Sequence, residues 1–260
     1  LAEKNKDITD SIRYAKRIQE AILPPQNVIK THFPNSFVFS KPKDIVSGDF
    51  FWFKPSQHNN ENIYQLAVGD CTGHGVPGAL MSILAISSLE EINSGDSIQQ
   101  PHLILNRLKT KITDSLKQRG EIGEQKDGLD LALIHVKTDS LKLEFAGAQL
   151  SAIMIRDGEM IELKGDRMPI GIHWGEQSSF TLQQRDVQTG DWIYLFSDGF
   201  QDQFGGDMNK KFKSRPLKNL FIEIAGLDAN DQRNKLERTF ESWKGSNEQT
   251  DDVCILGIRY

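Results

Sequence analysis

The sequence predicts an α+β domain in which two antiparallel β-sheets pack face to face and helices cover the outside. Short apolar runs follow one another as hairpins, while helical stretches are gathered between them and near the end of the chain. β-rich runs also stand at both ends of the domain, which favours terminal strands that share a sheet. A doubly wound parallel fold is excluded because strands and helices do not alternate.

The composition is that of an ordinary globular domain. The 260 residues include 31 Lys+Arg and 36 Asp+Glu, so the formal net charge is −5 at pH 7. A chain of this length buries about three-quarters of its unfolded surface and needs no disulfide to fold. The acidic balance argues against a nucleic-acid partner, since binding to phosphate groups favours a basic face.

The two cysteines, Cys71 and Cys254, exclude a disulfide framework and indicate a reducing, cytoplasmic compartment. No unbroken apolar run reaches the roughly 18 residues of a membrane span, so none is expected in this segment. The chain begins without Met and without a signal-peptide pattern. We therefore expect it to be the C-terminal part of a larger protein, and a membrane-attached parent is compatible with this expectation.

Residues 1–30 are expected to form an N-terminal linker and regulatory segment. Its helix ends at Leu23, because Pro24-Pro25 cannot continue it. Two interpretations stay open: the helix packs on its own domain, or it ends a coiled coil that joins an upstream module and pairs two copies of the chain. Its apolar residues follow a helical stripe: Ile8, Ile12, Ala15 and Ile22, with Ile18 on the flank.

The domain itself is expected over 36–260, and its elements follow in order. Strands are predicted at 37–39, 49–53 and 64–68, with a polar turn at 56–62. Helices over 78–92 and 101–118 come next. Strands then return at 129–136, 141–146, 152–155, 160–163, 180–182 and 192–196. Two helices, 217–225 and 230–243, precede a closing strand at 253–259.

Aspartates stand in turns at the ends of four apolar strands: Asp49, Asp70, Asp198 and Asp251, the last followed by Asp252. Each strand holds its carboxylate at the rim of a sheet. Carboxylates that converge repel one another, so such a set is stable only if a cation neutralises it. Oxygen ligands without a set of His or Cys favour Mg²⁺ or Mn²⁺ over zinc.

The segment 69–81 leads from a strand, through closely spaced glycines, into a helix start. Amides of the loop and of the helix N-terminus favour an anionic group nearby. The segment is not a Walker loop, because no Gly-Lys-Ser/Thr follows, and it does not match GxGxxG.

Several motifs together carry a family resemblance over 37–260: VSGDFFWF, VGDCTGHGVPGALMS, AGAQ, MPIGI, LFSDGFQDQFGG and TDDVCILGI. In this order and spacing they resemble the SpoIIE-type branch of the metal-dependent (type 2C) serine/threonine protein phosphatases. The resemblance implies a two-sheet sandwich with two Mn²⁺ or Mg²⁺ ions at one edge. It implies a phosphorylated protein substrate in bacterial partner-switching signalling, such as a STAS-domain anti-anti-sigma factor, and a sensor or receiver domain upstream.

Matched residue by residue, the resemblance makes Asp49 and Asp70 metal ligands, with Asp70 bridging both ions and the backbone carbonyl of Cys71 as a further ligand. Asp198 and Asp251 complete the shell of the second ion. Asp252 lies behind them, although an exchange of roles between Asp251 and Asp252 stays open. A water activated between the two ions then attacks the phosphorus, and no phosphoenzyme is needed.

His74 is the candidate general acid, against a surface or capping role. The basic run 209–215 is the candidate substrate-binding patch through three of its lysines, against a solvated loop. Eukaryotic relatives hold phosphate with an arginine that has no counterpart before Asp49, where Lys41 and Lys43 are the available cations. The candidate substrate-binding lysines are Lys210, Lys211 and Lys213.

Two other functions compete with the phosphatase. One is a non-catalytic signalling module that keeps the fold and binds a partner. The other is a Mg²⁺-dependent phosphodiesterase, which fits the carboxylates but not the acidic net charge.

Overall fold

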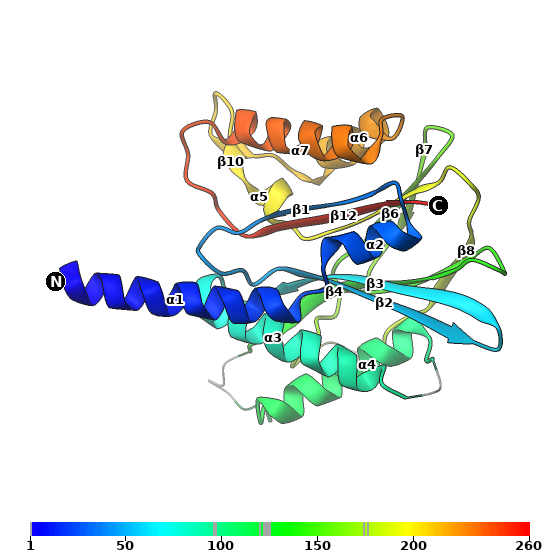
Figure 1. The fold of residues 1–260 in the computed structure, drawn as a ribbon, viewed down its shortest axis with the longest axis horizontal. Coiled ribbons are helices and arrows are strands. Elements are labelled where there is room, and N and C mark those ends of the chain that lie inside the picture. The colour runs from blue at the N-terminus through cyan, green and yellow to red at the C-terminus, as the bar shows by residue number, and fades with distance from the viewer. Residues whose placement is uncertain (1, 96–97, 120, 122–125, 174, 176) are drawn as a thin grey trace.

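Two five-stranded antiparallel sheets form the centre of the protein and pack face to face (Figure 1). The computed structural model describes residues 2–95, 98–119, 121, 126–173, 175 and 177–260; Leu1, the first residue of the expected linker, lies outside them. The first sheet has the order β1 (Ser36–Lys41), β12 (Val253–Arg259), β9 (Trp192–Phe196), β6 (Ala152–Arg156) and β7 (Glu159–Leu163). The second has the order β2 (Phe50–His58), β3 (Glu61–Cys71), β4 (Leu129–Lys137), β5 (Lys142–Ala148) and β8 (Gln183–Asp186).

Helices cover the outer faces of both sheets. In Figure 1, α6 (Ser214–Ile224) and α7 (Ala229–Lys244) lie over the first sheet, and α3 (Gly75–Ile92) and α4 (Pro101–Ser115) lie under the second. Short elements complete the chain: α2 (Gln26–His32), α5 (Gly199–Asp202), β10 (Phe204–Gly205) and β11 (Lys210–Lys211). The predicted two-sheet α+β class is confirmed, and the terminal strands β1 and β12 do pair.

Three apolar layers hold these elements together. The middle layer lies between the sheets and includes Val68, Ile134, Phe145, Leu195 and Leu256. The second layer joins α3 and α4 to the second sheet, and the third joins α6 and α7 to the first. Burial of this apolar surface on both faces fixes the strand register, because a slip by one residue would turn the middle layer outward.

The β2–β3 hairpin turns at Asn59 and Asn60, within the predicted polar stretch. Both residues have positive φ, 51° and 63°, as the two central positions of a type I′ turn require. Asn tolerates this left-handed conformation better than most residues do, and the turn matches the right-handed twist of the two strands.

Two differences from the expected elements have clear causes. The helix α2 is not among the predicted elements, yet its Ile29 and the following Phe33 are buried in the middle layer. The strand expected at 180–182 is instead β8, which begins at Gln183. Phe180 is buried, and its backbone N–H is bound by the side chain of Asn106 on α4, so this residue anchors the segment before the strand starts.

The helix α3 is, within the described residues, the one helix long and apolar enough by length and composition to cross a membrane. The sequence has no unbroken apolar run there because Ser and Glu interrupt it. α3 packs on the second sheet beside α4, and its apolar side chains supply much of that layer, among them Met81, Ala85, Ile86, Leu89 and Ile92.

The helix α1 (Ala2–Ile22) extends from the domain, with its N-terminal half projecting beyond it (Figure 1). The predicted stripe is only partly covered: Ile12, Ala15 and Ile22 are half-buried, whereas Ile8 and Ile18 are 59% and 45% exposed. Ile22 packs against the α3–α4 layer. The helix therefore docks mainly through its C-terminal half.

Candidate metal centre

Three carboxylates lie side by side at one end of the second sheet. Asp49 directly precedes Phe50, which pairs with Gly69, so Asp49 lies beside Asp70 on the neighbouring strand. On the other side of β3, Asp70 pairs with Asp130 of β4. Side chains that are opposite in an antiparallel pair share a face of the sheet. The antiparallel register thus brings together acidic residues that are up to 81 positions apart in the sequence.

The first sheet brings a second acidic group to the same edge. Asp198 follows β9, and Asp251 and Asp252 precede its neighbour β12. The two sheets are joined here by Ser197, whose Oγ donates a hydrogen bond to Asp49 Oδ2 at 2.5 Å and accepts one from the Cys254 N–H at 2.9 Å. The carboxylates of both sheets therefore meet at the seam between them.

Burial and mutual repulsion raise the pKa values of these carboxyl groups. For Asp70, burial and then the charges of Asp49, Asp198 and Asp251 raise the pKa from 3.8 to about 10. Burial also raises the pKa of Asp49 well above its ordinary value, despite the hydrogen bond from Ser197. Burial and neighbouring carboxylates raise the pKa of Asp198 as well, although the side chain of Asp70 is hydrogen-bonded to it. Protons are thus retained where cations are absent.

Asp130 joins this set but is not among the predicted residues. Burial, followed by the charge of Asp198, raises its pKa to about 7. The available signal was an aspartate inside the otherwise apolar run from Leu129 to Ile134. A strand residue of this kind is informative only once its partner across the sheet is known, and here that partner is Asp70.

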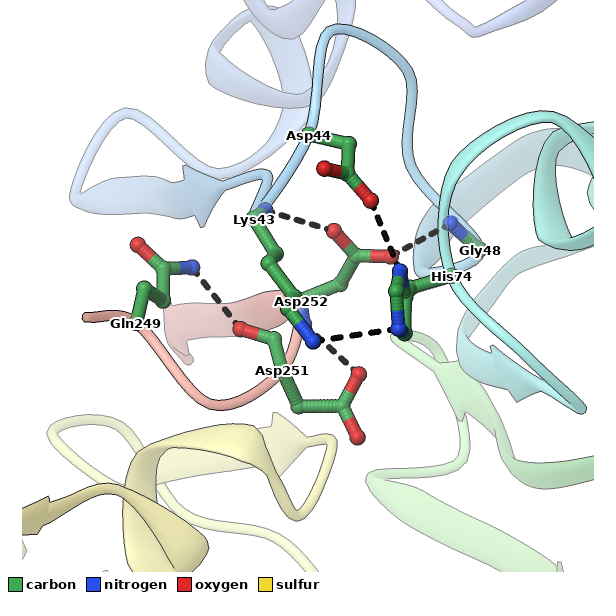
Figure 2. Close-up of polar contacts among 7 residues, drawn as sticks. All are labelled: Lys43, Asp44, Gly48, His74, Gln249, Asp251 and Asp252. Carbon is green, nitrogen blue, oxygen red and sulfur yellow. Dashed lines mark hydrogen bonds and ion pairs between the residues drawn. The ribbon is translucent and has the colours of Figure 1, made fainter.

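The two last aspartates have different surroundings (Figure 2). Asp252 is 2% exposed, and its two carboxylate oxygens accept the backbone N–H groups of Lys43 and Gly48, each at 2.7 Å. Asp251 is half-buried, accepts the Asp252 N–H through Oδ1, and its charge contributes to the raised pKa values of Asp49 and Asp70. This arrangement favours Asp251 as the ligand and Asp252 as a support of the 43–48 loop.

Glycines allow the loop before Asp49 and the loop after Asp70 to touch. A Cβ added at Gly48 would lie 2.7 Å from the Gly73 carbonyl oxygen and 3.3 Å from that of Cys71, and one at Gly78 would lie 2.2 Å from Gly73 O. Gly73 itself has φ +84°, which favours glycine. The Cys71 carbonyl thus lies at the contact of the two loops, while its thiol is buried and its pKa is raised by burial.

The donor set fits divalent cations that keep part of their water. All the converging side-chain donors are carboxylate oxygens, which suit Mg²⁺ or Mn²⁺. Within the described ranges, no three His, Cys, Asp or Glu side chains surround one point as ligands of a single ion. Mg²⁺ is usually bound through one or two carboxylates plus water. A set of raised-pKa carboxylates spread over two sheets is therefore suited to hydrated ions and not to an all-protein cage.

The comparison with known families gives a direct match. The SpoIIE family (stage II sporulation protein E) matches residues 60–260, and the SiaA-PP2C domain of Pseudomonas aeruginosa is 32% identical, with a TM-score of 0.87 over 100% of this chain and 99% of that one. The chain belongs to the SpoIIE family. The resemblance read from the sequence motifs is thereby confirmed, and the protein is a SpoIIE-type PP2C phosphatase domain.

More distant structures share the SpoIIE-type fold. The PP2C phosphatase domain of SpoIIE from Bacillus subtilis, solved with a fragment of its regulatory domain, is 18% identical with a TM-score of 0.64, over 86% of this chain and 61% of that one. RsbX in complex with magnesium is 13% identical with a TM-score of 0.57, over 86% of this chain and 94% of that one. A comparison with curated protein sequences found no match.

In this SpoIIE-type domain, His74 lies in a hydrogen-bonded chain at the rim of the carboxylate set (Figure 2). Its Nδ1 is 2.7 Å from Asp44 Oδ2, and its Nε2 is 3.0 Å from Lys43 Nζ. A carboxylate only accepts and an ammonium only donates, so the network assigns the proton to Nδ1 and the acceptor role to Nε2. The expected general-acid role of His74 stays a prediction.

The three lysines expected to bind substrate have different positions. Lys211 donates to Asp202 at 2.7 Å, and its charge lowers the pKa of Asp198. Lys210 and Lys213 are exposed, and within the described part of the chain no hydrogen bond or ion pair joins them to the carboxylate set. Substrate binding by this patch stays a prediction.

A polar cavity of about 200 Å³ opens beside Asp198. Gln149 reaches it from the β5–β6 turn, where its φ is +60°. Lys218 lines the opposite part and forms an ion pair with Glu162 at 2.8 Å. The other polar residues of the wall are Ser151, Ser197, Gln201 and Ser214. The wall of this cavity is therefore largely polar and adjoins the carboxylate set at Asp198.

Proposed function

We propose that this SpoIIE-type domain is a divalent-metal-dependent phosphatase that removes phosphate from serine or threonine of a partner protein in bacterial signalling. The observation that supports it most is the carboxylate set at the seam of the two sheets. Burial and repulsion raise the pKa values of these carboxyl groups, and bound cations would remove that repulsion. Without bound cations, the folded chain gains nothing from placing these buried carboxyl groups so close together.

In this proposal, one group of residues holds the metal ions and a second group orients the first. Asp49, Asp70, Asp198 and Asp251, with the Cys71 carbonyl, would hold the ions. When bound, two divalent ions supply an activated water and neutralise phosphoryl charge. Ser197 orients Asp49 through its 2.5 Å hydrogen bond, and Asp252 fixes the loop before Asp49 by accepting the Gly48 N–H.

Lys43 is the cation best placed to hold a phosphoryl oxygen. Its backbone is fixed by Asp252, and its Nζ is oriented by the His74–Asp44 pair. His74 then acts by orienting Lys43. This proposal replaces the missing arginine with a lysine that is kept in place by two acceptors, Asp252 and His74, on two loops.

The proposed partner is a phosphorylated STAS-domain protein. We further propose that α1 joins the domain to an upstream sensor or receiver and pairs two copies of the chain through its exposed apolar residues, Ile8 and Ile18 among them. The cytoplasmic compartment belongs to the same proposal, with both cysteines buried and free.

One assay tests the phosphatase. Phosphate release is measured from a phosphorylated STAS-domain protein, from p-nitrophenyl phosphate and from a nucleoside triphosphate, with Mn²⁺ and with EDTA. We expect Mn²⁺-dependent release from the phosphoprotein, lost in EDTA. If EDTA-sensitive release is absent with all three substrates, the catalytic proposal fails and the non-catalytic binding module is favoured. Preference for the nucleotide would instead favour a nucleoside-triphosphate hydrolase function.

Replacing Lys43 by Ala is expected to raise the KM for the phosphoprotein by about tenfold, because a hydrogen bond to a charged group contributes about 1.5–3 kcal/mol. The backbone N–H of Lys43 is unchanged, so its bond to Asp252 remains. Steady-state kinetics at saturating Mn²⁺ measure the effect. Lys54→Ala is the matched control, because it removes a lysine of β2 that is paired with Glu90 of α3. An unchanged KM in Lys43→Ala contradicts the phosphate-holding role.

A further inference from the structure

Gln19 stands out in α1 because, among residues 3–22, it is the buried residue of a helix that is otherwise exposed or half-buried. Its exposed fraction is 5%, while its neighbours Ile18 and Glu20 are exposed. Its position continues the spacing of the apolar stripe, four residues after Ala15 and three before Ile22, but its side chain is polar. A long polar side chain loses solvation and rotamer freedom on burial, so its position requires compensating hydrogen bonds.

Those hydrogen bonds go to the loop that leads to Asp49. Gln19 Oε1 accepts the Ser47 backbone N–H at 3.2 Å, and Nε2 donates to the Ser47 carbonyl at 2.6 Å and to Ser82 Oγ of α3 at 2.8 Å. One amide side chain thus satisfies both backbone groups of Ser47. Ser47 in turn accepts the Asp49 N–H on its Oγ at 3.1 Å, so Gln19 is linked to Asp49 through one residue.

The chemistry of this contact is specific to an amide. The contact needs one acceptor and two donors at the end of a single side chain, which Gln provides and Glu or Met does not. Ser47 is 7% exposed and Ser82 is fully buried, so water does not readily replace the lost partner. A buried backbone group that is left without a partner is destabilising, and this destabilisation falls on the 43–49 loop.

Besides the Asp44–His74 pair, two further anchors of the loop lie on either side of this contact. Asp252 holds the N–H groups of Lys43 and Gly48, and Ser197 holds the Asp49 carboxylate. Both anchors come from the first sheet or its flanking turns. Gln19 is the anchor from the outer side, on the helix that enters the domain.

We propose that Gln19 is a positioning residue that holds the 43–49 loop, and with it Asp49, in the geometry of the metal centre. The link to metal rests on the proposed function, in which Asp49 is a ligand. Displacement of α1 breaks three hydrogen bonds at once and removes Gln19 from the backbone N–H and carbonyl of Ser47. A movement of this helix therefore changes the constraints on the 43–49 loop.

The test uses the chain 1–260 with Gln19→Met, which keeps the length of the side chain and removes its donors and acceptor. Asn5→Leu is the matched control, since it removes an exposed amide from the same helix. Hydrogen–deuterium exchange of the metal-free chains is measured at amides 46–50. We expect exchange about tenfold faster or more in Gln19→Met, since about 1.4 kcal/mol corresponds to tenfold, with other strands unchanged. Mn²⁺ titration by calorimetry should show weaker binding.

Equal exchange in the two variants, or an increase spread evenly over the whole domain, overturns the proposal. If Gln19→Met does not fold, Ser82→Ala is the second variant; it removes the bond from Gln19 Nε2 and the 3.5 Å contact of Ser82 Oγ with the Ser47 carbonyl. A smaller local increase is expected at the same amides, and no increase overturns the proposal equally. The exchange readout does not depend on catalysis. Wild-type chain that binds no Mn²⁺ would refute the proposed function while the exchange result still decides the role of Gln19 in the loop.

Discussion

Replacing Asp70 by Asn is expected to abolish turnover while raising the melting temperature of the metal-free chain. Asp70 is the central carboxylate of the set, between Asp49 and Asp130, and burial and repulsion raise its pKa to about 10. The neutral amide removes that repulsion, and each kcal/mol gained shifts Tm by about 2–4 °C in a domain of this size. Turnover should fall on the order of 10³-fold, since a metal ion supplies several kcal/mol of transition-state stabilisation.

Two measurements on the same protein check this pair of effects. Phosphate release with Mn²⁺ gives the activity, and thermal unfolding in EDTA gives the stability. Asp157→Asn is the matched control, because it makes the same change in the exposed β6–β7 turn. Near-normal turnover in Asp70→Asn refutes the bridging role, and a lowered melting temperature refutes the electrostatic account of the cluster.

The second large effect is a pH dependence that is opposite in sign to that of a protein stabilised by surface carboxylates. Asp49, Asp70 and Asp198 have pKa values raised above 3.8, so the folded chain retains protons that the unfolded chain releases. Asp130 behaves in the same way. The stabilisation that these protonated carboxyl groups contribute is present in full below about pH 4, and it is lost as pH rises through the folded pKa values, about 7 for Asp130 and about 10 for Asp70. The metal-free chain should therefore lose stability from pH 7 to pH 8.5.

This window isolates the carboxylates from the buried His135. Burial lowers the pKa of His135 to about 3, so its contribution changes below the unfolded value near 6.5 and is constant above pH 7. Thermal unfolding in EDTA and in Mn²⁺ measures the effect. Mn²⁺ should raise the melting temperature more at pH 8.5 than at pH 7, because its binding displaces these protons. A flat or rising metal-free profile, or an unchanged slope in Asp70→Asn, contradicts the prediction.

Much of the fold follows from local patterns. Alternating and continuous apolar runs, with Asn and Gly turns between them, predicted the hairpins and most helices to within a few residues, and the β1–β12 pairing followed from the strands at both ends. The pattern fails where a residue is placed by tertiary contact. Phe180 looks like a strand residue, but Asn106 of α4 holds its backbone outside the sheet.

The site was predictable where each residue carries its own local signal. Asp49, Asp70, Asp198 and Asp251 end or begin strands beside turns, and the structure brings them to one edge. Asp130 lacks such a signal, since its role depends on the partner across the strand. The same holds for contacts between loops, in which the orientation of Lys43 by His74 depends on two segments that are 31 positions apart.

Gln19 shows the limit of periodicity in its clearest form. The spacing of α1 places Gln19 on the same face as Ile12, Ala15 and Ile22, but an apolar pattern does not predict a polar residue at a buried position. In α1 the most buried residue is polar, because the surface beneath it is the backbone of a loop and not an apolar layer. Side-chain patterns carry no information about where unpaired backbone groups will lie.

The place of β12 in the first sheet has a consequence for biosynthesis. It is the last strand in the sequence, yet it lies between β1 and β9 and carries Asp251 and Asp252 at its start. While the chain emerges from the ribosome, this sheet lacks an inner strand and its edge lacks two carboxylates. The seam between the sheets therefore closes only after β12 has been made, so the carboxylate set is incomplete in a nascent chain that still lacks this strand.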